Sequence, residues 1–141
     1  MEKVWEELHK AAMAVIRPRE VSRLMEAGGV AAAVESASGR IYVGVCVDTA
    51  CTLGVCAEQN ALFNMITNGE DAIRRVIAVD RDGNAVPPCG ACREFMTQLM
   101  PDGYRSIEIM MDWAQNRIVT LGELTPAMVD ITPTIEYASF L

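Results

Sequence analysis

The chain has 141 residues, which at roughly 100–200 residues per domain predicts one domain spanning residues 1–141. Nineteen acidic and twelve basic residues give a net charge of −7, which excludes the basic surface that nucleic-acid binders use to grip phosphates. Hydrophobic residues make up 51% of the chain, yet no apolar run approaches the roughly 18–20 residues of a membrane span. We therefore expect burial in a core and in subunit interfaces, with neither nucleic acid nor a membrane as partner.

The first half of the chain predicts one helix and a hairpin. Residues 2–16 place apolar side chains at helical spacing, and Pro18 ends the pattern. Residues 30–35 and 41–47 are short apolar runs rich in small and β-branched residues, separated by Ser-Gly-Arg at 38–40. These two runs are expected to pair as antiparallel strands.

The second half alternates helices and strands. Helices are predicted for residues 56–67 and 90–100, and strands for residues 76–79 and 107–111. Thr120 begins a capping-box sequence that opens a short late helix. A hairpin followed by alternating α and β units predicts an α/β protein, a three-layer α/β/α sandwich on a mixed sheet.

Five cysteines are the main clue to chemistry, and an odd number cannot pair off completely. The acidic N-terminus is not typical of an export signal, so we expect a cytoplasmic protein whose thiols stay reduced. Cysteines in such proteins serve as metal ligands, catalytic groups or small buried apolar side chains. The five are Cys46, Cys51, Cys56, Cys89 and Cys92.

Three of these cysteines and one glutamate form a candidate zinc site. Cys56, Cys89 and Cys92 all fall at predicted helix N-termini, where the helix dipole offsets thiolate charge. Three thiolates leave Zn²⁺ one open tetrahedral position, in which a bound water becomes acidic. Glu58 follows Cys56 by two residues and is well placed to shuttle protons. A redox dithiol, or a closed zinc site completed by Cys46, Cys51 or His9, is the alternative interpretation.

The residues around these cysteines resemble those of a known family. Residues 53–58 read Leu-Gly-Val-Cys-Ala-Glu and residues 88–94 read Pro-Cys-Gly-Ala-Cys-Arg-Glu, as in the small three-cysteine cytidine deaminases and their blasticidin S deaminase relatives. The likeness extends from about Val30 to Pro126. It implies a mixed five-stranded sheet, a homotetramer and one zinc ion per chain.

The resemblance also implies the reaction and the roles of the site residues. The substrate would be an amino-substituted pyrimidine such as cytidine, deoxycytidine or a cytosine-containing analogue, converted to the oxo product with release of ammonia. Cys56, Cys89 and Cys92 would bind zinc, and Glu58 would transfer protons between water and substrate. The main chain at Ala57 would hold the amidine edge of the substrate ring.

The residues that would bind the substrate depart from the family pattern. Where the family has Gly-x-Asn-x-Glu-Asn, residues 44–49 read Gly-Val-Cys-Val-Asp-Thr, so Cys46 and Asp48 stand at the substrate-binding positions. Family aromatic positions within residues 28–32 and 124–129 hold no aromatic residue. A blasticidin S-type or other amino-heterocycle deaminase is therefore an alternative function, as is a zinc-stabilised interaction module with a degenerate pocket.

The remaining notable residues receive structural interpretations. Gln59 replaces a family arginine, so Arg93 and the helix ends are expected to offset the thiolate charge. Cys46 and Cys51, if not zinc ligands, are expected to be small buried side chains, and His9 a solvated or lightly packed surface residue. Structural roles are expected for Trp113 and Phe140.

Overall fold

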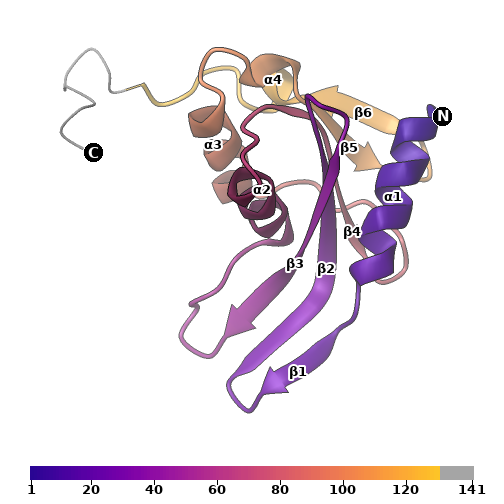
Figure 1. The fold of residues 1–141 in the computed structure, drawn as a ribbon, viewed down its shortest axis with the longest axis vertical. Helices are drawn as coiled ribbons and strands as arrows, with labels where there is room; N and C mark the ends of the chain where they lie inside the picture. Colours follow the sequence, from indigo (N-terminus) through magenta and orange to yellow (C-terminus); the bar gives the residue numbers. More distant parts are fainter. Residues whose placement is uncertain (131–141) are drawn as a thin grey trace.

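The computed structural model describes residues 1–130, which form a mixed sheet with helices on both faces (Figure 1). The helices are α1 (Lys3–Val15), α2 (Ala57–Thr67), α3 (Gly90–Leu99) and α4 (Leu121–Leu124), with one 3-10 turn, η1 (Tyr104–Ser106). The strands are β1 (Arg19–Ser22), β2 (Met25–Ser36), β3 (Ile41–Thr49), β4 (Ile73–Asp80), β5 (Glu108–Asp112) and β6 (Arg117–Thr120).

Strand β2 is the centre of the sheet. It pairs antiparallel with β3 along one edge, while β1 and β4 share its other edge, β1 near the start of β2 and β4 near its end. Strand β5 then adds parallel to β4, and β6 adds antiparallel to β5. The predicted mixed sheet is confirmed, but the described residues form six strands rather than five.

The two short strands were not predicted because their sequences carry no strand pattern. All four residues of β1 are exposed, so it shows no alternation of apolar and polar side chains. Strand β6 also has four residues, below the length at which a period-2 pattern can be recognised.

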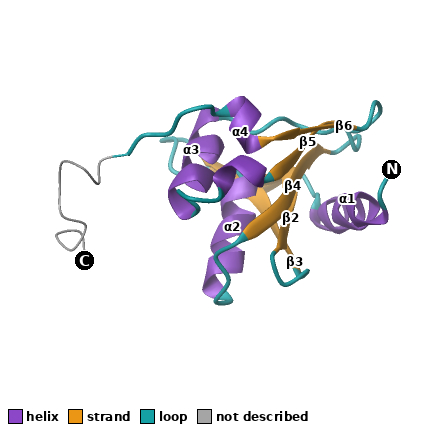
Figure 2. Cartoon of the chain, turned by 90° about the horizontal axis from the view of Figure 1, so that it is seen from above, coloured by secondary structure: helices purple, strands orange, loops and turns teal. Residues whose placement is uncertain are grey.

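Side chains at alternate positions of β2 point into two different hydrophobic cores. Ala31 and Ala33 belong to the cluster beneath α1, whereas Ala32 and Val34 belong to the cluster beneath α2 and α3. Because successive strand residues point to opposite faces, one buried strand serves both layers. Figure 2 shows α1 on one side of the sheet and α2 and α3 on the other, which confirms the three-layer sandwich.

Helix α1 packs through the apolar face that its spacing predicted, with Trp5 and Leu8 fully buried. His9 is half-buried and packed, so of the two predicted alternatives the solvated one is wrong. Its Nε2 donates to the carbonyl oxygen of Gly83 at 2.9 Å, and its ring stacks on Trp113 with the centroids 4.0 Å apart. Trp113 therefore has the expected structural role, and Phe140 lies outside the described residues.

Helix α2 lies directly on β3 at Gly44, which leaves no room for a side chain. A Cβ atom at Gly44 would lie 2.3 Å from the backbone nitrogen of Ala61. Gly44→Ala is expected to lower the free energy of unfolding by about 1–3 kcal/mol, the typical effect of overpacking. Urea denaturation measures this change. Gly29→Ala is the control: its Cβ would meet nothing within 4 Å, so a shift within about 0.5 kcal/mol is expected.

No helix within residues 1–130 combines the length and the apolar character needed to cross a membrane.

Candidate active site

The sheet topology brings the two predicted cysteine clusters together. Strands β3 and β4 lie on either side of β2 and both run antiparallel to it. They therefore run in the same direction, and their carboxyl ends lie at the same end of the sheet. Helix α2 follows β3 and α3 follows β4, so both helices begin at this end of the sheet. Cys56 is the N-cap of α2 and Cys89 is the N-cap of α3, with Cys92 in the first turn of α3.

The three thiols have the spacing that a tetrahedral zinc ion requires. The Sγ atoms of Cys56 and Cys89 are 3.6 Å apart, and those of Cys89 and Cys92 are 3.5 Å apart. Zn–S bonds of 2.3 Å at tetrahedral angles place sulfur atoms about 3.8 Å apart. Within residues 1–130 the metal-binding group consists of these three cysteines, without Cys46, Cys51 or His9. The cluster therefore fits a site with one open coordination position, not a closed structural site.

Local electrostatics differ among the three thiols. For Cys89, burial opposes ionisation, but the pKa is still lowered because the backbone N–H groups of Cys92 and Ala91 and the neighbouring thiols hydrogen-bond the thiolate. Burial is the main cause that raises the pKa of Cys56 and of Cys92. The N-terminus of α3 thus stabilises one thiolate directly, whereas the other two thiols need a cation to hold them ionised.

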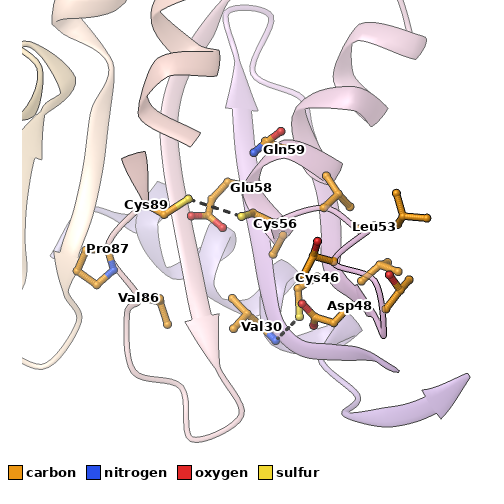
Figure 3. A pocket seen from close by; sticks show the side chains of 16 residues that line it. Val30, Cys46, Asp48, Leu53, Cys56, Glu58, Gln59, Val86, Pro87 and Cys89 are labelled. Carbon is orange, nitrogen blue, oxygen red and sulfur yellow. Dashed lines mark hydrogen bonds between the residues drawn. The ribbon is translucent and has the colours of Figure 1, made fainter. Parts of the chain in front are cut away.

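Glu58 is a buried carboxyl group in the first turn of α2, with 5% of its surface exposed. Burial raises the pKa of Glu58, an effect that hydrogen bonds from its own backbone N–H and from Cys92 partly oppose. Glu58 lies outside the metal-binding group but borders the same pocket as Cys56 and Cys89 (Figure 3). A protonatable carboxyl group beside an open metal position is suited to general acid–base chemistry.

A pocket of about 550 Å³ extends from the cysteines along the end of β3. Figure 3 shows Val86 and Pro87 on one side of it and Cys46 and Asp48 on the other. All three predicted substrate-binding residues line it: Cys46, Asp48 and Ala57. The other lining residues are Val30, Val47, Thr49, Thr52, Leu53, Gly54, Val55, Cys56, Glu58, Gln59, Val86, Pro87 and Cys89. Among the described residues, none that lines the pocket is aromatic or positively charged.

Residues 5–104 match the family model described as the cytidine and deoxycytidylate deaminase zinc-binding region. The chain belongs to the cytidine and deoxycytidylate deaminase family. With the three-cysteine cluster at its helix N-termini, it is a zinc-dependent hydrolytic deaminase.

Individual relatives agree with this family membership. The deaminase is 32% identical over 100 residues to a cytidine deaminase of Halalkalibacterium halodurans, a match that covers 69% of this chain and 74% of the relative. It is 32% identical over 89 residues to a blasticidin-S deaminase of Bacillus cereus, covering 57% and 64% of the two chains. The crystal structure of a cytidine deaminase from Mycobacterium leprae matches it with a TM-score of 0.72 at 28% identity, covering 87% and 98%.

Cys46 has a structural contact that sequence reasoning missed. The β2–β3 register shifts so that residues 28–30 of β2 stand opposite Cys46 alone, and the Cys46 thiol accepts a hydrogen bond from the Val30 N–H at 3.3 Å. Cys51 is exposed on the turn after β3, so the prediction that it is buried is wrong; Cys46 is half-buried in the pocket wall and packs against the apolar core, so the prediction holds for it in part. Short polar turns such as the one at Cys51 lie at the surface, because their backbone groups need water.

The side chain that contacts the cysteine cluster is Gln59, not Arg93. The Gln59 side-chain amide donates to the Cys92 sulfur at 3.8 Å. Arg93 instead donates from Nε to the carbonyl oxygen of Pro88 at 3.0 Å, which braces the loop before Cys89. Part of the role expected of Arg93, a polar contact to the cysteine sulfurs, therefore belongs to Gln59. The position of Gln59 directly after Glu58 was the sequence feature that could have indicated this contact.

Proposed function

We propose that this deaminase removes the exocyclic amino group of an amino-substituted pyrimidine, with cytidine, deoxycytidine or a cytosine-containing analogue as substrate. One water is consumed, and the oxo product and ammonia are released. The observation that carries the proposal is a three-thiol cluster that suits a metal ion with one open position and that borders one pocket, through Cys56 and Cys89, together with the buried carboxyl group of Glu58. The pocket is of the size that takes small molecules.

Five residues of the site have proposed roles. Cys56, Cys89 and Cys92 hold one zinc ion per chain. When bound, zinc supplies a Lewis acid that acidifies water at neutral pH. Glu58 accepts the two protons of the water one after the other, and delivers the first to the ring nitrogen and the second to the amino group, which leaves as ammonia. The backbone at Ala57 binds the amidine edge, which orients the ring beside Glu58.

Charge around the pocket favours a substrate without phosphate. Asp48 and Glu58 are its two carboxyl-bearing lining residues, and no Lys or Arg lies among the described lining residues. A phosphate group needs cationic or backbone N–H partners, so a nucleotide would meet uncompensated repulsion from Asp48. We therefore propose a neutral or cationic substrate whose substituent on the ring contacts Asp48 and Cys46.

A blasticidin S-type deaminase is the second candidate function. The similarity to the Bacillus cereus blasticidin-S deaminase favours it, as does a pocket wall without aromatic side chains from the described residues. A zinc-stabilised interaction module is the non-enzymatic alternative. It would need the cysteines but has no use for a buried carboxyl group such as Glu58, whose desolvation is unfavourable without a function to offset it.

We further propose that the enzyme is a homotetramer working in the cytoplasm. Phe63 and Ile66 on α2 are each 42% exposed, which is consistent with burial against other subunits. The cysteines are free thiols, the state that a reducing compartment maintains. Light scattering on the purified protein tests the assembly: a mass of four chains supports the proposal, and a monomer contradicts it.

An ammonia-release screen tests the proposed function. The zinc-loaded protein is incubated with cytidine, deoxycytidine, 5-substituted cytosines, blasticidin S, guanine and deoxycytidylate. We expect ammonia from at least one neutral cytosine nucleoside and little from deoxycytidylate. Ammonia from blasticidin S alone would favour the second candidate. One zinc per chain without ammonia from any compound would leave the interaction module as the better interpretation.

A further inference from the structure

Asparagine recurs at every fourth position along α2, although asparagine is a poor helix former. The residues are Asn60, Asn64 and the C-cap residue Asn68, and this spacing places them on one face of the helix as an asparagine stripe. The Nδ2 atom of Asn60 donates to the carbonyl oxygen of Val45 at 3.0 Å. The Nδ2 atom of Asn64 donates likewise to the carbonyl oxygen of Val43 at 3.3 Å. The stripe therefore joins α2 to β3 through two side-chain hydrogen bonds.

The stripe fits the backbone of β3 because the helix and the strand repeat over nearly the same distance. Four residues of an α-helix rise by about 6.0 Å and two residues of a strand by about 6.6–6.8 Å, so successive asparagines meet alternate carbonyl groups. Val47 exchanges two backbone hydrogen bonds with Val55, so its polar groups face away from β2. Val45 and Val43 have the same orientation because a strand repeats every two residues. The stripe thus supplies partners for carbonyl groups on the edge of β3 that faces away from β2.

Asn60 lies in the part of α2 that carries the chemistry. It follows Glu58 by two residues, and its backbone N–H donates to the carbonyl oxygen of Cys56 at 3.0 Å. Its strand partner, Val45, directly precedes Cys46, which lines the same pocket as Cys56 and Glu58 (Figure 3). The bond from Asn60 to Val45 therefore connects the first turn of α2 to the strand that forms the substrate wall.

This hydrogen bond restrains α2 in a direction that steric contact leaves free. A Cβ atom at Gly44 would lie 2.3 Å from the backbone nitrogen of Ala61, so α2 already touches β3 there. Such a contact limits how closely the two elements approach, but not a shift of one along the other. Residues 50–54, which connect them, are exposed, so burial does not hold this connection in place. A hydrogen bond is directional, so the bond from Asn60 also fixes the position of α2 along β3.

We propose that Asn60 is a positioning residue whose bond to β3 holds Glu58 and Cys56 where the reaction needs them. This inference rests on the proposed roles of Glu58 and the cysteines. A displacement of about 1 Å can lower the rate of an enzyme about a hundredfold, and loss of a side chain that orients a metal ligand weakens metal binding about tenfold to a hundredfold. Asn64 makes the same kind of bond one helix turn farther from the site, and it is exposed where Asn60 is half-buried. Its bond should therefore add to stability without positioning the first turn.

The test compares Asn60→Ala with Asn64→Ala, since each removes one side-chain bond to a β3 carbonyl group. Alanine favours the helix, so both variants are expected to fold, with shifts in Tm of similar size. Asn60→Ala should lower kcat about tenfold or more and leave KM within about threefold, on the compound that the wild type deaminates fastest in the ammonia-release screen. It should also raise the Kd for zinc about tenfold, measured by competition with a chelator. Asn64→Ala should keep kcat and the zinc Kd within about twofold of the wild type.

Two further variants show whether the amide of Asn60 itself acts. Asn60→Gln keeps a side-chain amide that can donate, although the side chain is one methylene longer. Asn60→Leu is close in shape to asparagine but has no donor. We expect kcat to recover in part in Asn60→Gln and not in Asn60→Leu, whereas a role in packing alone would favour leucine.

Two results would overturn the inference while the proposed function stands. The first is an Asn60→Ala enzyme whose kcat and zinc Kd both stay within about twofold of the wild type. The second is an equal loss of kcat in Asn60→Ala and Asn64→Ala that follows their loss of Tm, as a purely structural role would predict. If the wild type deaminates none of the compounds, the proposed function fails, and the zinc Kd of the two variants still tests the placement of Cys56.

Discussion

Glu58→Gln is expected to lower kcat by about 10²–10⁴-fold while the protein keeps its zinc and its fold, the typical loss when a general acid–base group is removed. Glutamine has nearly the shape of glutamate and can fill the same buried site, but its amide cannot transfer a proton. Glu58 is not part of the metal-binding group, so zinc content should remain at one per chain. Turnover by ammonia release, zinc by mass spectrometry and stability by thermal unfolding are measured together.

Glu7→Gln is the matched control for this prediction. Glu7 is an exposed residue of α1, on the opposite side of the sheet, and it undergoes the same change from carboxylate to amide. It should retain wild-type turnover. A Glu58→Gln enzyme with turnover within a few-fold of the wild type would refute the proposed proton transfer through this residue.

Cys89→Ala is expected to abolish stoichiometric zinc binding and to destabilise the fold. The Cys89 Sγ lies 3.6 Å from that of Cys56 and 3.5 Å from that of Cys92, so its loss leaves only two of the three thiol ligands. A ligand present at a hundredfold excess over its Kd stabilises the native state by about 2.7 kcal/mol, and the variant forfeits at least this contribution. Zinc content and urea denaturation with and without added zinc measure the two effects.

Cys51→Ala separates the loss of zinc from the general loss of a thiol. Cys51 is exposed and lies outside the metal-binding group, so the variant should keep one zinc per chain and its stability. A full complement of tightly bound zinc in Cys89→Ala would show that Cys89 is not a ligand. Equal zinc loss in both variants would point to a different metal site.

Much of the fold could be predicted because its signals are local. The apolar spacing in α1, and the capping box in which Thr120 and Glu123 bond each other's backbone N–H, identify elements from a few adjacent residues. The start of β2 was missed because Gly28 and Gly29 resemble a turn. In the structure they form a bulge within a longer strand, with Gly28 at a φ of +85°.

For the candidate site too, features with local signals could be predicted and contacts between distant segments could not. The motif spacing was sufficient to select Cys56, Cys89, Cys92 and Glu58, because the helices that carry them follow β3 and β4, which run in the same direction on either side of β2 and end at the same end of the sheet. Contacts between distant segments could not be predicted: Gln59 with Cys92, and Cys46 with Val30. The packing of His9 on Trp113 is of this kind as well, since a lone histidine in a helix does not indicate its tertiary partner.

The most direct test of the account is a quantitative comparison of ammonia release and zinc content with cytidine as substrate. The zinc-loaded protein should release one ammonia for each oxo product formed. A chelator that strips zinc should stop the reaction, and added zinc should restore it. Deamination at an unchanged rate after complete removal of zinc would contradict the account, as would a fully zinc-loaded protein that releases no ammonia from cytidine or any other amino-heterocycle.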